Sequence, residues 1–181
     1  MKAIRIAINA ITDPAGTPVS QETLSIQEVQ ASLFQMLEEN VLCSIATVTS
    51  THQAYVNTAY FSYTDDLKLY FLSHPGSQHC QNLMSNPSMA MAVFSSSQTW
   101  GGPDRGLQLF GTCDPALGSN ATRAANSYKK RFPAYADWQK GLGQGDPGKS
   151  YRLYRFLVNR VKIFDERGWG ESLFVLATIS R

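Results

Sequence analysis

The segment from Ser73 to His79 has the clearest capacity for binding chemistry. It follows a predicted strand and leads into a short predicted helix. The first turn of a helix has backbone N–H groups without intrahelical partners and the positive end of the helix dipole, which together suit a phosphate group. Further donors are available from the side chains of Ser73, Ser77, Gln78 and His79. The alternative interpretation is a capped turn, in which Ser77 serves only its own helix.

Other kinds of catalytic site have little support. His74 and His79 lie five residues apart, but no cysteine or carboxylate stands at a matching spacing nearby, so we expect no metal site. The chain lacks the Gly-x-Ser-x-Gly, Walker and dinucleotide-binding glycine patterns, and no order of residues suggests a catalytic triad. His52 lies in a polar loop and is expected to be exposed. The absence of Cys-x-x-Cys spacing predicts reduced thiols at Cys43, Cys80 and Cys113.

The composition is that of an ordinary folded domain without a strong attraction to polyanions. Of the 181 residues, 43% are hydrophobic and 17% are charged, and the formal net charge is +2. This length and apolar content predict one domain with a continuous core. We expect no nucleic-acid or membrane partner, because the basic residues form no long run. The densest basic group, residues 128–132, is interpreted as the solvated face of a helix.

The first residues predict a strand rather than a secretion signal. Ile4, Ile6 and Ile8 share one side of an extended strand. Arg5 and Asn9 interrupt the apolar stretch that a signal peptide requires. No apolar run approaches the ~20 residues that cross a bilayer as a helix. We therefore expect a cytoplasmic protein.

A helix and a series of strands are predicted along the rest of the chain. Ser25 and Glu28 match a Ser-x-x-Glu capping box, and apolar residues at helical spacing continue toward Asn40. Apolar and β-branched runs between turn residues predict strands over 41–49, 53–63, 67–73, 89–95, 105–113, 151–164 and 169–179. Further helices are expected over 77–84 and 119–131, and the glycines from Gly141 to Gly148 indicate a flexible connector.

This pattern predicts a mainly β domain with flanking helices, of the α+β class. An antiparallel meander of this kind hides its edges best by closing into a small barrel. We expect one domain over 1–181: an N-terminal strand and turn (1–24), a capping helix (25–40) and a barrel with inserted helices (41–181).

The segment around the predicted phosphate site resembles a known family. Gly76 to Pro87, GSQHCQNLMSNP, is similar to the Gly-Ser-Arg-Lys…Glu-Leu…Ser-Asn-Pro segment of the pyridoxamine 5′-phosphate oxidase-like family. The strand from Arg105 to Gly111 resembles that family's Arg-Gln-Val…Gly strand. The hairpin from Tyr63 to Ser73 resembles the strand pair before its phosphate loop. His79 and the Tyr-x-x-Arg-Phe-Pro sequence at 128–133 are similar to a poorly characterised bacterial branch rather than to the true oxidase.

The resemblance implies a six- to eight-stranded antiparallel split β-barrel. It further implies a homodimer with FMN at its interface, acting on a small-molecule substrate. In the family an Arg and a Lys, at the positions of Gln78 and His79, hold the FMN phosphate, and a strand matching residues 56–61 lines the flavin ring. Together, the resemblance and the residue chemistry give these expected cofactor-binding residues: Val56, Asn57, Thr58, Ala59, Leu72, Ser73, Ser77, Gln78, His79, Gln108 and Trp169.

The chain departs from the family pattern where the phosphate is held. Gln78 is neutral and His79 is charged only when protonated, whereas charge-assisted bonds to phosphate are about twice as strong as neutral ones. We therefore expect weaker FMN binding that strengthens as the pH falls. Gly106 stands where the family has a glutamine, for which Gln108 on the same strand face could substitute. The paired basic residues that hold the vitamin's phosphate in true oxidases are missing near the C-terminus, which speaks against that substrate.

Three functions follow from these observations. The leading hypothesis is an FMN-dependent oxidoreductase of unknown substrate. The second is a split barrel that binds deazaflavin F420 or haem, with His74 or His79 as the available axial ligand. The third is a non-enzymatic cofactor-binding or sensor module. Trp100 is expected to pack against the end of the barrel. Trp169, in a Gly-Trp-Gly turn, fits flavin stacking and ordinary packing equally well.

Overall fold

The described chain, residues 4–19 and 24–181 of a computed structural model, is built mainly of strands. The strands are β1 (Arg5–Thr12), β2 (Leu42–Val48), β3 (Ala54–Tyr63), β4 (Lys68–Ser73), β5 (Ser88–Val93), β6 (Arg105–Pro115), β7 (Arg152–Asp165) and β8 (Phe174–Ser180). The helices are α1 (Ile26–Glu39), α2 (Gln78–Ser85), α3 (Ser119–Arg131), α4 (Ala134–Gly141) and α5 (Glu166–Trp169), with a 3-10 turn, η1 (Pro147–Ser150). None of the described helices is long and apolar enough to cross a membrane.

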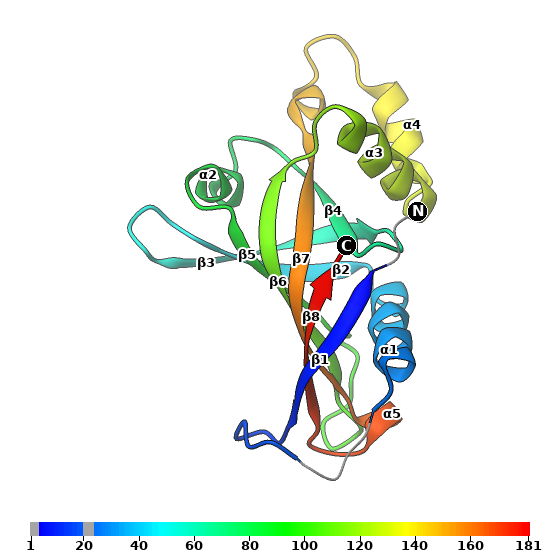
Figure 1. The fold of residues 1–181 in the computed structure, drawn as a ribbon. Coiled ribbons are helices and arrows are strands. Elements are labelled where there is room, and N and C mark those ends of the chain that lie inside the picture. Colours follow the sequence, from blue (N-terminus) through cyan, green and yellow to red (C-terminus); the bar gives the residue numbers. More distant parts are fainter. Residues whose placement is uncertain (1–3, 20–23) are drawn as a thin grey trace.

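Six strands close into an antiparallel barrel, and two more extend the sheet. The barrel strands pair in the order β7, β4, β3, β2, β5 and β6, and β6 pairs back to β7. β8 pairs with residues 160–164 of β7, beyond the residues 152–157 that pair with β4, and β1 pairs with β8 at the edge. Figure 1 shows β6 and β7 running side by side as the longest strands of the molecule. The architecture confirms the predicted split barrel.

One glycine allows the two long strands to stay paired. The register between β6 and β7 shifts between Phe110 and Gly111, which bends the ladder. A Cβ added to Gly111 would collide with the backbone carbonyl of Leu157. The bulge therefore requires a residue without a side chain, as is common where two backbones approach closely.

The helix α1 begins as predicted and closes one side of the core. Ser25 accepts a hydrogen bond from the Glu28 backbone at 3.2 Å, and the Glu28 carboxylate accepts one from the Ser25 backbone at 2.8 Å. This reciprocal pair is the predicted capping box. The buried face of α1 joins the barrel core through Val29, Leu33, Met36 and Leu37.

Several local predictions were wrong, and side-chain contacts explain most of them. α3 ends at Arg131, as predicted, but a further helix that was not predicted, α4, begins directly after Pro133, because proline is tolerated at a helix start. The final strand begins at Phe174 rather than at residue 169. The Asp165 side chain accepts a hydrogen bond from the Gly168 backbone, which winds the intervening residues into α5. Trp100 does not pack against the barrel but is 98% exposed, and nothing in the structure explains it.

Candidate functional site

The loop between β4 and α2 folds tightly at the start of the helix. Ser73 ends β4 and is buried, and Ser77 is the N-cap residue of α2. The backbone N–H of Ser77 donates to the carbonyl of His74 at 3.0 Å. The side chain of Gln81 donates back to the carbonyl of Pro75 at 2.7 Å. These contacts hold the loop against the first turn of its own helix.

A compact polar cluster lies at this helix start. The Nε2 atom of His79 lies 2.7 Å from Ser73 Oγ and 3.2 Å from Ser77 Oγ, and the two hydroxyls are 3.2 Å apart. Because Ser77 turns toward His79, its side chain makes no capping bond to the helix. The first turn of α2 therefore keeps backbone N–H groups without a side-chain partner, as an anion site requires. The simple capped-turn alternative does not describe this loop.

The electrostatic surroundings suit an anion. The chain has no carboxylate from Leu67 to Pro103, a stretch that includes β4, α2 and β5. Gln78 contributes less than expected, because its amide nitrogen donates to Asn82 at 2.8 Å. Asn82 in turn donates to Thr47 of β2 at 3.0 Å, which ties α2 to the barrel. The loop supplies hydroxyls, an imidazole and backbone N–H groups, but no permanent cation.

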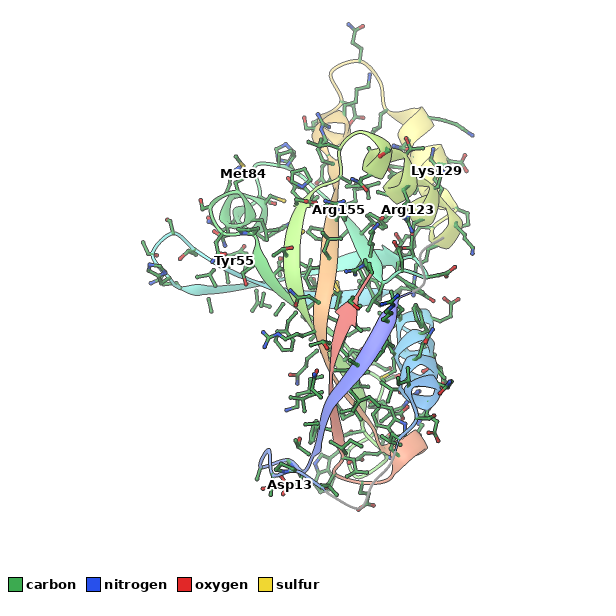
Figure 2. The ribbon with its side chains drawn as sticks, viewed as in Figure 1. Asp13, Tyr55, Met84, Arg123, Lys129 and Arg155 are labelled. Atoms are coloured by element: carbon green, nitrogen blue, oxygen red, sulfur yellow. The ribbon has the colours of Figure 1, made fainter. Side chains whose placement is uncertain are left out.

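The strand predicted to line the flavin ring is part of β3, which lies beside α2. One face of this strand is exposed, and the other is turned toward the core. In Figure 2, Tyr55 on β3 and Met84 on α2 project on the same side of the molecule. Val56 and Thr58 are exposed, whereas Ala59 packs against the core. Asn57 donates to the Thr58 carbonyl at 3.2 Å, but its own side-chain oxygen is buried without a hydrogen-bond partner. A buried acceptor of this kind is normally satisfied by a donor such as water, a ligand or a partner chain.

A shallow apolar groove runs over the outer face of β2, β3, β5 and β6. Its volume is about 260 Å³, and its walls include Val56, Gln108, Phe110 and the small residues Ala46 and Ala90. Val56 is 63% exposed. The groove therefore brings together two of the predicted cofactor residues, Val56 and Gln108.

A glutamine at Gly106, as in the family pattern, would require the neighbouring Phe164 ring to move. A Cβ at this position would lie 2.7 Å from Cζ of Phe164 on the neighbouring strand. The aromatic ring of Phe164 thus fills the space that a side chain would need. This contact gives the physical reason for the departure noted in the sequence.

Two predicted residues lie apart from the polar cluster. Leu72 lines a different pocket, of about 270 Å³, together with Trp138, Tyr151 and Arg152. Trp169 lies in α5 and packs against the main core, at the opposite end of the barrel from α2 (Figure 1). Within one chain the structure unites Ser73, Ser77 and His79 but does not bring Trp169 to them.

The histidines are poorly arranged for metal binding. The Nδ1 atom of His74 accepts a hydrogen bond from Gly76 at 3.0 Å, and the Nε2 atom of His79 is engaged by two hydroxyls. A ligating nitrogen needs its lone pair free. Within residues 4–19 and 24–181, no group of three or more His, Cys, Asp or Glu side chains could hold a metal. His52 is exposed, as predicted.

Two residues beneath the loop were not predicted from the sequence. Burial alone would raise the pKa of the Cys80 thiol, but hydrogen bonds lower it to about 7, and they come from His79, Ser77, Tyr154 and Ser73. Burial and the contact with Cys80 raise the pKa of Tyr154. No sequence signal could have indicated this contact, because it depends on the pairing of β4 with β7. Cys80 thus belongs to the polar cluster, although it is fully buried.

Two arginines in the motifs that carry the family resemblance have structural roles. Arg131 donates to the carbonyls of Leu37 and Asn40, each at 2.6 Å, and so caps the C-terminus of α1. It is not part of a solvated helix face, unlike its exposed neighbours at positions 129 and 130. Arg105 pairs with Asp165 at 2.7 Å and with Glu39 at 2.8 Å. Arg105 thus joins α1 to the barrel, and Arg131 joins α1 to α3.

Comparison with known families gives one match that covers most of the chain. The family described as pyridoxamine 5′-phosphate oxidase matches residues 29–164, which include α2 and every barrel strand but the last residue of β7. A comparison with curated protein sequences gives no match.

Solved structures with the same fold include proteins with different stated roles. A haem-binding protein from Mycobacterium smegmatis has a TM-score of 0.66 and 14% identity, over 87% of this chain and 59% of that one. The haem storage protein HutZ from Vibrio cholerae has a TM-score of 0.63 and 16% identity, over 78% and 97%. An oxidase-like protein from Listeria innocua, named as a putative pyridoxamine 5′-phosphate oxidase, has a TM-score of 0.56 and 15% identity, over 75% and 98%. Likeness at this level of identity establishes the fold alone.

Proposed function

Because the chain belongs to the pyridoxamine 5′-phosphate oxidase family, we propose that it binds FMN, with the phosphate at the first turn of α2. The observation that carries this proposal is the uncapped helix start, bordered by the side chains of Ser73, Ser77 and His79. These groups would hold the phosphate through hydroxyl, imidazole and backbone N–H donors. The unpaired oxygen of Asn57 would accept a hydrogen bond from the flavin ring, whose imide N–H is a donor.

The chemistry of the bound group would be a redox reaction on a small molecule. FMN supplies hydride or electron transfer, and the protein supplies binding and orientation. The backbone of Val56 to Ala59 would lie along the flavin ring, as the family resemblance implies. Gln108, on the groove wall opposite Val56, would border the same ring. The identity of the substrate is not part of this proposal.

We also propose that the chain acts as a homodimer through the groove face of the barrel. Val56, Tyr60 and Phe94 are each at least half exposed, and the groove between β3 and β6 is lined by small apolar residues. A contiguous exposed apolar surface of this kind favours a protein interface. A partner covering this face would shield the flavin ring, and it offers a route by which Trp169 of a second copy could approach the cofactor.

Haem is the second candidate, because His74 is an exposed imidazole on the loop. Its ring packs edge-on against Tyr151, with the ring centres 5.7 Å apart. To coordinate iron through Nδ1, His74 would have to lose its hydrogen bond from Gly76. To coordinate through Nε2, it would have to move the proton that this bond places there. The loop geometry thus favours an anion over iron.

The test is a visible absorption spectrum of the purified protein, before and after addition of FMN, haemin or deazaflavin F420 and removal of unbound ligand. Equilibrium titration of each ligand, followed by absorbance or fluorescence, covers binding too weak to survive desalting. We expect saturable FMN binding to a dimer, as measured by analytical ultracentrifugation. Saturable haemin binding with no response to FMN would overturn the proposal, as would the absence of any flavin response.

A further inference from the structure

The proposed phosphate site has no permanent cation within its own loop. Ser73 to Asn82 contains serines, glutamines, histidines and an asparagine, but no lysine or arginine. Neutral donors hold phosphate less strongly than charged ones. A cation from another part of the fold would therefore change the affinity of the site considerably.

The pairing of β4 with β7 brings an arginine to this position. Ser73, the last residue of β4, is directly opposite Arg152, the first residue of β7. Directly opposed residues in an antiparallel pair have their side chains on the same face, with Cβ atoms ~4.5–5.5 Å apart. Ser73 uses this face to contact His79. Arg152 thus begins on the same side of the sheet as the polar cluster.

The guanidinium of Arg152 is anchored but remains available. Its Nη1 atom donates to the carbonyls of Lys149 and Tyr151 at 2.7 and 2.9 Å, which fixes the side chain at the start of β7. Within residues 4–19 and 24–181, no ion pair or hydrogen bond engages its Nε and Nη2 atoms. The residue is exposed, and its side chain lines the pocket beside Leu72. The guanidinium must therefore turn from that pocket toward Ser73 to meet a phosphate at the start of α2. Arg155, on the same strand, differs because it is already paired with Asp114 at 2.6 Å.

The charge of Arg152 also acts on Tyr154, two residues along β7, which contacts the polar cluster. The positive charge of Arg152 acts to lower the pKa of Tyr154. Burial and the contact with Cys80 have the larger effect, so the pKa of Tyr154 is raised overall. Tyr154 contacts Cys80 in the first turn of α2. No carboxylate from β4 to β5 competes for the guanidinium, because residues 67–103 contain none.

We propose that Arg152 supplies the missing cation of the phosphate site, in place of the Arg-Lys pair that the loop lacks. This inference rests on the proposed function and adds to it a residue that determines preference for a phosphorylated flavin. Arg152 would approach the phosphate from β7, while the helix start and the hydroxyls approach it from α2. A guanidinium suits this role because its planar donors can contact two phosphate oxygens together.

The experiment compares FMN with riboflavin, which has the same ring and no phosphate. Equilibrium titrations would use the full-length protein and the variants Arg152→Met and Arg152→Lys. We expect Arg152→Met to weaken FMN binding by about tenfold or more, and to leave riboflavin binding within about twofold. The FMN affinity of Arg152→Lys should lie between those of the wild type and Arg152→Met, since lysine keeps the charge and loses the two-oxygen contact. The Arg152→Met effect on FMN should also diminish at high salt.

Lys129→Met is the matched control. It removes one positive charge from an exposed residue on α3, across the barrel from α2 (Figure 2). It should change the affinity for neither FMN nor riboflavin. Equal FMN affinity in the wild-type protein and in Arg152→Met would overturn this inference and leave the proposed function intact. Wild-type protein that binds neither flavin would overturn the proposed function itself. Equal losses for FMN and riboflavin would show that Arg152 maintains the fold of the site and does not contact phosphate.

Discussion

At one end of the barrel Arg105 lies 2.7 Å from Asp165, and Ser32 donates to the same carboxylate at 2.6 Å. At the other end Ser73, Ser77 and His79 contact one another beside an uncapped helix start. The first group is buried, charged and satisfied within the chain. The second is largely neutral, partly exposed and has donors left over. In the proposal, it is unused hydrogen-bonding capacity, more than charge, that makes the α2 end the ligand-binding end.

The comparison also separates family resemblance from function. Arg105 and Arg131 belong to sequence motifs that resemble the family, yet both are used to fix α1. The loop from Ser73 to His79 has lost the family's charged residues, yet it keeps the geometry of an anion site. Substitutions at the Arg105–Asp165 end should therefore change stability and leave ligand affinity unchanged. Substitutions in the loop before α2 should change ligand affinity and leave stability unchanged.

The largest expected effect is on stability, from Asp165→Ala. Removing one partner of a buried ion pair leaves an uncompensated charge, which costs about 3–5 kcal/mol of unfolding free energy. Chemical denaturation should show this loss, while the folded fraction keeps its FMN affinity. The control is Asp137→Ala, which removes an exposed 3.4 Å pair with Lys140 and should cost less than ~0.5 kcal/mol. A loss below ~1 kcal/mol for Asp165→Ala would mean that the α1 end is not held by this pair.

The same pair predicts a pH dependence of stability. Burial raises the pKa of Asp165, but the hydrogen bonds from Arg105 and Ser32 outweigh burial and hold that pKa below its usual value. The stabilisation is therefore fully present above the unfolded pKa of ~3.9 and is lost as the pH falls through the lower folded value. The unfolding free energy should fall in this acidic range, and Asp165→Asn should make the fall shallower. An unchanged slope in the variant would contradict the assignment.

A change at the other end should alter affinity and not stability. Replacing Gln78 with Arg and His79 with Lys restores the family's cations at the first turn of α2. We expect FMN to bind about tenfold more tightly, because each charge-assisted bond is stronger than a neutral one. Riboflavin should not respond. Unchanged FMN affinity in the double variant would mean that the phosphate lies elsewhere.

The smallest expected effect is from Ser25→Ala at the start of α1. It removes the side-chain acceptor of the capping box, which costs about 1 kcal/mol. Thermal denaturation should show a small loss of stability with no change in flavin binding. Ser77→Ala provides the contrast at α2. Because Ser77 makes no capping bond, its loss should reduce FMN affinity more than stability.

The sequence predicted the fold where local signals act alone. The capping box at Ser25, the helix from Ser119 to Arg131 and the alternating strands are all local patterns, and the structure has them. α4 was not predicted, because a proline after one helix is compatible both with a loop and with the start of the next helix. α5 was missed because its first turn depends on the side chain of Asp165.

The site was predicted only in part, because much of it depends on pairing between distant strands. The loop residues Ser73, Ser77 and His79 were predicted from their own segment. The opposition of Ser73 and Arg152 and the contact of Cys80 with Tyr154 depend on the β4–β7 register. Trp169 was grouped with the site because of its Gly-Trp-Gly turn, and within one chain it packs against the core, away from the loop of α2.

The most direct test of the account is flavin titration of the variant Gln78→Glu. A negative charge in the first turn of a helix favours the helix but repels a phosphate bound there. Gln30→Glu, which makes the same change at an exposed position on α1, is the control. We predict that Gln78→Glu keeps its thermal stability, loses about tenfold or more in FMN affinity and retains its riboflavin affinity. FMN affinity equal to that of wild type would contradict a phosphate site at the first turn of α2.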